Sequence, residues 1–195
     1  YERIEERVGG VALFMNGAQG GMVTADNRQA KSDELPDQWA ECVRIGTLLA
    51  DEAIRLIQGG QVLTDPELLC VSKQINFPVE SPIMQYILEH SPLGYLSHAP
   101  NEITTRINAV KIGPATILTI PGEALPNIGY YLKRKMKSDY PFLFGLTNDA
   151  FGYILTKVDF DSFERYAYIS RTSLGEMTGE IYLDKALALV DELDR

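Results

Sequence analysis

The residue best placed for chemistry is Glu123, which stands where an apolar run ends and a helical repeat begins. Residues 117–120 are apolar, a Pro-Gly turn follows, and apolar residues recur at helical spacing from Leu125 onward. The pattern predicts a strand, a tight turn and a helix with Glu123 at its start. A carboxylate there is kept ionised by the helix dipole and lies where α/β proteins place their sites. The alternative is a charge that only stabilises the helix N-terminus.

A second candidate is the glycine-rich loop that contains Gly17, Gly20 and Gly21. It follows residues 11–15, a continuous apolar run that is typical of a strand covered on both faces. Clustered glycines indicate a backbone that turns sharply or approaches another group closely. The spacing matches neither a Walker phosphate loop nor a dinucleotide-binding fingerprint. A sugar- or nucleotide-binding α/β module that uses this loop is one hypothesis for the function.

Two further loops carry polar and aromatic residues. Residues 142–144 predict a short buried strand, and small and polar residues follow it up to Tyr153. This composition predicts a loop that faces a site. An acidic and aromatic stretch at 159–166 comes next, and a polar, flexible one at 171–175 follows it.

The elements that must position these loops follow from periodicity, caps and turns. Predicted helices cover residues 1–8, 39–57, 81–90, 125–136 and 184–193, and predicted strands cover 11–15, 68–77, 102–112, 115–120 and 142–144. Gly113-Pro114 predicts an antiparallel hairpin, and the apolar stripe of the second helix is expected to be core. We therefore predict one domain over residues 1–195, with an α/β fold in which helices pack on the faces of a mixed β-sheet.

The composition limits the partners of this chain. Its 195 residues are 45% hydrophobic and 23% charged, which is ordinary for a globular domain. A net charge of -9 argues against nucleic acid, because the phosphates would be repelled. No apolar run approaches the ~20 residues that span a bilayer, and no signal-peptide pattern opens the chain. A soluble chain is expected.

The cysteines and histidines are few. Cys42 and Cys70 stand in apolar contexts, where a buried free thiol is the common case. His90 and His98 flank a turn-rich stretch and lack the spacing of a helical metal pair, so neither is expected to bind a metal. The first residue, Tyr1, already belongs to a helical repeat. We expect this sequence to be part of a longer protein and any site in it to be partial.

Three separated segments, at residues 16–27, 119–132 and 148–166, together resemble the second half of the catalytic domain of neutral or alkaline, non-lysosomal ceramidases. That family consists of zinc amidases. Its Gly-Asp-Val-Ser-Pro-Asn loop carries a serine nucleophile, and residues 21–26 (Gly-Met-Val-Thr-Ala-Asp) resemble that loop with Thr24 in place of the serine. The resemblance implies that Gly20 and Gly21 contact the substrate.

The other two segments carry the residues that the family uses around its metal. Pro121-Gly-Glu-Ala-Leu resembles the Pro-Gly-Glu-Phe-Thr turn, whose glutamate binds zinc, and this implies Glu123 as a ligand. The segment that begins at Asn148 resembles an Asn-x-Tyr-x-Gly-Tyr loop, which implies Tyr153 as a second ligand and Asn148 as a substrate contact. Tyr166 corresponds to a tyrosine that faces the substrate amide.

The resemblance thus implies the C-terminal part of a zinc-dependent hydrolase that cleaves an N-acyl amide, N-acylsphingosine or a related compound, in sphingolipid metabolism. Its partners would be the lipid amide substrate, a membrane surface reached through that substrate, and the N-terminal half of the same protein, which supplies the histidine ligands. A secreted or extracytoplasmic location is also implied. The isolated chain is predicted to be inactive. The alternative is a catalytically inactive ceramidase-like domain with a structural or binding role.

Overall fold

The computed structural model describes residues 1–21, 25, 38–95 and 100–193. Their contacts divide the chain into two units. The first comprises residues 1–14 and 22–64, and the second comprises residues 15–21 and 65–195. None of the described helices is both long enough and apolar enough to cross a membrane.

The first unit is built from two helices, α1 (Glu2–Val8) and α2 (Gln38–Gln58), which contact each other. Both were expected from their periodicity. Gly9 ends α1 with φ +80°, a left-handed conformation that glycine adopts without strain. The Arg3 guanidinium donates to the Asp51 carboxylate at 2.6 Å and joins the two helices. This ion pair lowers the pKa of Asp51 through the hydrogen bond from Arg3.

The prediction that the apolar stripe of α2 is core is wrong for most of its length. Only Ala50 and Ile54 are buried in this helix, while Trp39, Val43 and Leu49 are exposed. The periodicity correctly indicated one apolar face, but α1 has only seven residues and covers little of it. Cys42, expected to be buried, is exposed for the same reason.

The second unit contains a four-stranded mixed sheet in the order β1-β2-β3-β5. The strands are β1 (Leu68–Pro78), β2 (Glu102–Ile112), β3 (Ala115–Thr119) and β5 (Tyr140–Phe144). The first three strands are antiparallel, and the predicted hairpin places Ile112 opposite Ala115. β5 lies parallel to β3. The predicted α/β class with a mixed sheet is therefore confirmed.

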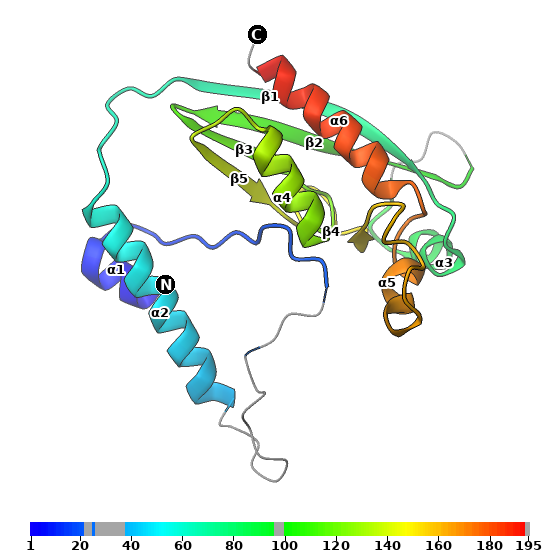
Figure 1. Cartoon of the computed structure of the whole chain (residues 1–195), viewed down its shortest axis with the longest axis horizontal. Coiled ribbons are helices and arrows are strands. Elements are labelled where there is room, and N and C mark those ends of the chain that lie inside the picture. The colour runs from blue at the N-terminus through cyan, green and yellow to red at the C-terminus, as the bar shows by residue number, and fades with distance from the viewer. Residues whose placement is uncertain (22–24, 26–37, 96–99, 194–195) are drawn as a thin grey trace. The chain divides into compact units, whose positions relative to one another are not determined.

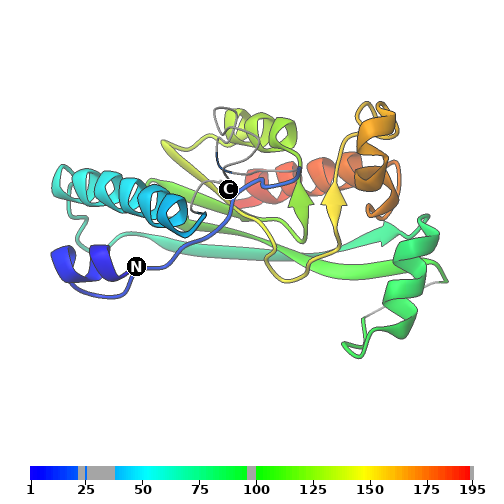
Figure 2. The ribbon, with the colours of Figure 1, turned by 90° about the horizontal axis from the view of Figure 1, so that it is seen from below.

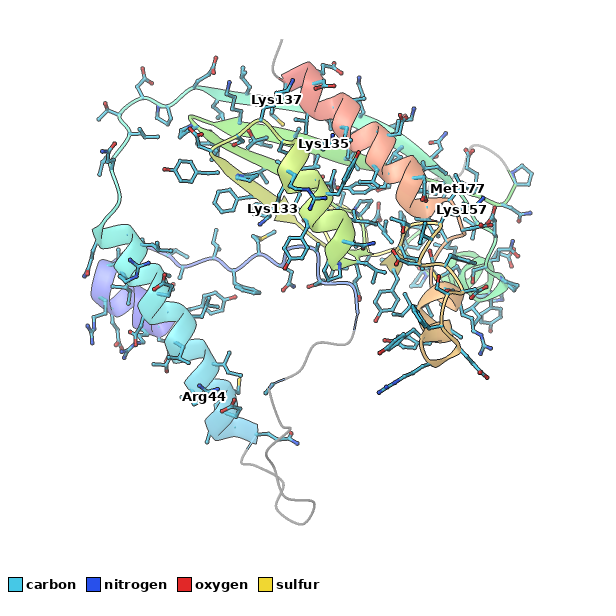
Figure 3. The ribbon with its side chains drawn as sticks, viewed as in Figure 1. Arg44, Lys133, Lys135, Lys137, Lys157 and Met177 are labelled. Atoms are coloured by element: carbon cyan, nitrogen blue, oxygen red, sulfur yellow. The ribbon has the colours of Figure 1, made fainter. Side chains whose placement is uncertain are left out.

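Two helices cover one face of this sheet, as Figures 1 and 2 show. α4 (Pro126–Lys135) contacts β5, α6 (Thr178–Leu193) contacts β1 and β2, and the two helices contact each other. Between them and the sheet lies the core, which includes Ile107, Leu118 and Leu132, each fully buried. The last turn of α4 contains Lys133 and Lys135, and Lys137 lies just beyond it (Figure 3). Positive charges are favourable at this end of a helix because of the helix dipole.

Smaller elements complete the second unit. α3 (Pro82–His90) begins as predicted, because the Ser81 hydroxyl accepts from the N–H of Met84 at 3.4 Å. The remaining elements are β4 (Glu123–Ala124), β6 (Tyr153–Ile154), the 3-10 helix η1 (Glu164–Tyr166) and α5 (Ala167–Arg171).

Residues 11–15 do not form the predicted buried strand. They have no regular secondary structure, and Val11, Leu13 and Phe14 are exposed. An apolar run becomes a strand only where a neighbouring strand pairs with its backbone, and no described strand does so here. The expectation of burial also fails for Cys70 and Phe142, because both lie on the sheet face opposite α4 and α6.

Tyr182 of α6 gives a testable link between this helix and the sheet. It is fully buried, and its hydroxyl donates to the Thr119 carbonyl at 2.9 Å. We expect Tyr182→Phe to lower the free energy of unfolding by about 1–2 kcal/mol, since the carbonyl loses its buried donor. Chemical denaturation at pH 7 measures this loss.

Tyr182 should also make the stability of the fold depend on pH. Burial raises the pKa of Tyr182 far above its ordinary value of 10.0. The unfolded chain therefore releases this proton near pH 10 while the folded chain retains it, so stability falls above about pH 10, by at most ~1.4 kcal/mol per pH unit. Tyr182→Phe should remove that part of the alkaline slope. An unchanged slope in the variant would contradict the assignment.

Candidate functional site

The candidate site is built on a short parallel ribbon formed by β4 and β6. Glu123 pairs in register with Tyr153, and Ala124 pairs with Ile154. Neighbouring residues on a strand point to opposite faces, and Ala124 and Ile154 are both buried in the core. The side chains of Glu123 and Tyr153 therefore share the other face, on adjacent strands that lie about 4.8 Å apart.

Two glycines allow this close packing. The N–H of Glu123 donates to the Gly152 carbonyl at 2.8 Å. A Cβ on Gly122 would lie 2.7 Å from that same carbonyl oxygen. Gly152 has φ +74°, and a Cβ there would lie 2.0 Å from the Thr172 carbonyl oxygen. Neither position has space for a side chain, so both need glycine. The glycines of Pro-Gly-Glu and Phe-Gly-Tyr thus let the two strands pack closely enough to place the carboxylate beside the phenol.

Glu123 does not begin the helix, contrary to the sequence prediction. α4 starts at Pro126, and the N–H of Leu125 donates to the Ile154 carbonyl at 2.9 Å. Leu125, which the sequence pattern placed in the first helical turn, therefore hydrogen-bonds to β6 instead. Glu123 lies three residues before the helix, where the helix dipole has little effect. The alternative that its carboxylate serves only the helix N-terminus is not supported.

Tyr153 is partly buried and faces a second tyrosine that the sequence analysis did not select. The ring centroids of Tyr153 and Tyr168 are 5.9 Å apart in an edge-to-face contact. Burial raises the pKa of the Tyr153 phenol, and the charge of the nearby Glu123 carboxylate raises it further. Tyr153 is therefore a neutral phenol at pH 7. The Tyr-Ala-Tyr spacing of residues 166–168 was the only signal for Tyr168.

The glycine-rich loop lies directly against this ribbon. The N–H of Gly20 donates to the Ala124 carbonyl at 2.7 Å, and a Cβ on Gly20 would lie 2.5 Å from the Glu123 carbonyl oxygen. Gly20 is buried, and Gly21 follows with φ +112°. The close approach expected from the clustered glycines is confirmed. Thr24 lies outside the described residues, so its assignment as nucleophile stays a prediction.

The other assigned residues have different surroundings. Asn148, at φ +75°, donates from its side-chain amide to the Arg106 carbonyl at 2.7 Å. Tyr166 is exposed, and its ring contacts are with Phe163 and Arg165. It is Tyr168, and not Tyr166, whose ring contacts Tyr153. The substrate roles of Asn148 and Tyr166 stay predictions.

Glu123 and Tyr153 supply a carboxylate and a phenol oxygen, which are acceptable ligands for a divalent ion. Among the described residues, no group of three or more His, Cys, Asp or Glu side chains is positioned to hold a metal. His90 bonds to the Tyr86 carbonyl through Nδ1 at 2.8 Å and stacks on the Tyr86 ring. His98 lies outside the described residues. The pair fits part of a zinc site, and the site needs further ligands.

The second unit thus combines a four-stranded mixed sheet, two helices on one face and the short β4–β6 ribbon. Comparison with solved structures confirms this fold. A ceramidase complexed with C2 matches with a TM-score of 0.61 and 13% identity, over 82% of this chain and 35% of the other. Neutral ceramidase from Pseudomonas aeruginosa matches with a TM-score of 0.57 and 16% identity, over 85% and 35%.

The chain therefore has the fold of part of a neutral ceramidase, as the three sequence segments predicted. It spans about a third of the length of the ceramidase chains that it matches. No protein-family model and no curated protein matches the sequence.

Proposed function

We propose that this chain is the C-terminal part of a zinc-dependent amide hydrolase that resembles neutral ceramidase and cleaves an N-acyl amide, N-acylsphingosine or a related lipid. The observation that carries the proposal is the register pairing of Glu123 with Tyr153 beside Gly20, on a ceramidase-like fold. These are the positions that the family resemblance assigns to the metal and to the nucleophile loop. The fold is shared, whereas the chemistry is inferred from these side chains.

In this proposal Glu123 and Tyr153 hold zinc together with histidines from outside this chain. A bound zinc ion polarises an amide carbonyl and lowers the pKa of a bound water or hydroxyl group. Glu123 would supply a carboxylate oxygen to the ion. Tyr153 must release its phenolic proton to bind well, so metal binding is expected to release protons and to weaken as the pH falls.

Thr24 would supply the nucleophilic hydroxyl and Gly20 and Gly21 would contact the substrate, as the family resemblance implies. The substrate amide would meet Asn148 and Tyr166. The lipid substrate would bring the protein to a membrane surface. The family resemblance also implies a location outside the cytoplasm.

Zinc titration and an amide assay of two proteins test the proposal. The 195-residue chain is expected to bind zinc weakly and to hydrolyse no fluorogenic N-acyl amide, because it offers two oxygen ligands where catalytic zinc sites use three protein ligands. The full-length protein is expected to bind one zinc ion and to turn the substrate over. Tight zinc binding with turnover by the 195-residue chain would show that the site is elsewhere. An inactive, metal-free full-length protein would favour the structural or binding role.

A further inference from the structure

A cavity of about 600 Å³ lies in the second unit, and the proposed zinc ligands do not line it. Its walls come from β1, β2, the segment after α3 and the loop after β5. Its lining includes Gln74, Tyr95, Thr104, Arg106 and Asp149. Asn148, which also lines the cavity, is the one residue shared with the proposed substrate contacts.

The sheet register places the donors of this cavity side by side. Arg106 pairs with Gln74 on the neighbouring strand, so these two side chains lie on the same face. Thr104 is two residues from Arg106 on β2 and therefore shares that face. It is the face opposite Ile103 and Ile107, which belong to the core under α6.

Thr104 has an unmet hydrogen-bonding requirement. The residue is 4% exposed, and its Oγ1 atom is buried without a hydrogen-bond partner among the described residues. A buried hydroxyl group without a partner costs about 1–3 kcal/mol. A ligand that brings a hydrogen-bonding group to this hydroxyl would recover part of that cost.

Two opposite charges also line the cavity without pairing with each other. The Arg106 guanidinium is exposed and has no hydrogen bond or ion pair within the described part of the chain. The Asp149 carboxylate accepts a hydrogen bond from the Thr105 hydroxyl. No ion pair joins Arg106 to Asp149, so their charged atoms lie more than 4 Å apart. Thr105 lies on the face of β2 opposite Thr104 and Arg106, but residues from both faces line this one cavity, so a single ligand in it can contact both charges.

We propose that this cavity binds a small zwitterion that carries a carboxylate and an ammonium group, such as an α-amino acid. The Arg106 guanidinium binds the carboxylate, the Asp149 carboxylate binds the ammonium group, and the Thr104 hydroxyl bonds to the carboxylate. Leu93 and Tyr95 provide an apolar wall for the ligand's side chain. A ligand with only one charge would face repulsion from Asp149 or from Arg106.

Calorimetric titration of the 195-residue chain tests this site with L-leucine as the probe. L-Leucine is expected to bind at least ten times more tightly than N-acetyl-L-leucine, which lacks the ammonium charge, or L-leucine methyl ester, which lacks the carboxylate charge. Equal binding of either analogue would overturn the zwitterion assignment. An absence of L-leucine binding up to 10 mM, roughly the limit at which weak ligands are detected, would overturn the site itself.

Two variants and a matched control locate the binding. Arg106→Gln is expected to weaken L-leucine binding at least tenfold, while Arg134→Gln, at an exposed arginine of α4, leaves it unchanged. Thr104→Val keeps the side-chain shape, so it should weaken binding without lowering the melting temperature of the free chain. If Arg106→Gln binds as the parent does, the cavity is not the site. The result is independent of zinc, so the proposed amidase chemistry can fail while this site stands.

Discussion

Replacing Glu123 by Gln in the full-length protein is expected to lower amide hydrolysis about 10³-fold, which corresponds to ~4 kcal/mol of transition-state stabilisation. The neutral amide keeps the size of the side chain but is a much weaker zinc ligand than a carboxylate. The pairing with Tyr153 and the hydrogen bond to the Gly152 carbonyl use backbone groups, so the ribbon should survive the change. Zinc content by elemental analysis and the rate with a fluorogenic N-acyl amide give the two readings.

Glu192→Gln is the matched control for this experiment. Its carboxylate, near the end of α6, forms an ion pair with Lys73 of β1, and both side chains are about half exposed. Exposed ion pairs contribute about 0–1 kcal/mol to stability, so activity and zinc content should stay at the parent level. Full activity of Glu123→Gln with zinc retained would exclude Glu123 as a ligand.

Gly152→Ala is expected to destabilise the second unit by about 3 kcal/mol or more. A residue with a Cβ is strained at φ +74°, and that Cβ would lie 2.0 Å from the Thr172 carbonyl oxygen, which is main chain and cannot rotate away. The Thr172 carbonyl also accepts from the N–H of Tyr153 at 3.3 Å, so relief of the clash would displace Tyr153. Chemical denaturation monitored by circular dichroism measures the loss.

Gly17→Ala provides the control for this prediction because it lies in the same unit. Among the described residues, a Cβ there would meet only the Leu143 carbonyl oxygen, at 3.8 Å, which is an ordinary contact. We expect its stability to stay within about 0.5 kcal/mol of the parent. If Gly152→Ala were as stable as Gly17→Ala, the tight turn before Tyr153 would not constrain the ribbon as the structure indicates.

Much of the second unit could be predicted from the sequence because its signals are local. Ser81 and Pro82 marked the start of α3, and Gly113-Pro114 marked the hairpin between β2 and β3. The motif around Glu123 was recognisable because a Pro-Gly turn after an apolar run has few conformations. In the first unit the predicted helix end at residue 8 is also confirmed, because Gly9 follows with a positive φ that favours glycine.

Burial was the least predictable property. The run at residues 11–15 and the stripe of α2 are as apolar as core segments, yet most of their side chains are exposed in the described structure. Amino-acid type determines how favourable burial would be, whereas a neighbouring element of suitable size determines whether burial occurs. The sequence contained no local signal for that neighbour.

The sequence by itself determined the longer helices, the strands β1, β2, β3 and β5, the turns at glycine and proline, and the family that the three loop segments resemble. Only the tertiary structure decided that Glu123 pairs with Tyr153 in a ribbon before α4, that Gly20 lies against it, and that Tyr168 contacts Tyr153. The contact of longest range among these joins Gly20 to Ala124, and 124 − 20 = 104 positions separate the two residues. They depend on strand register and on the absence of Cβ atoms at close approaches, and neither can be read from local periodicity.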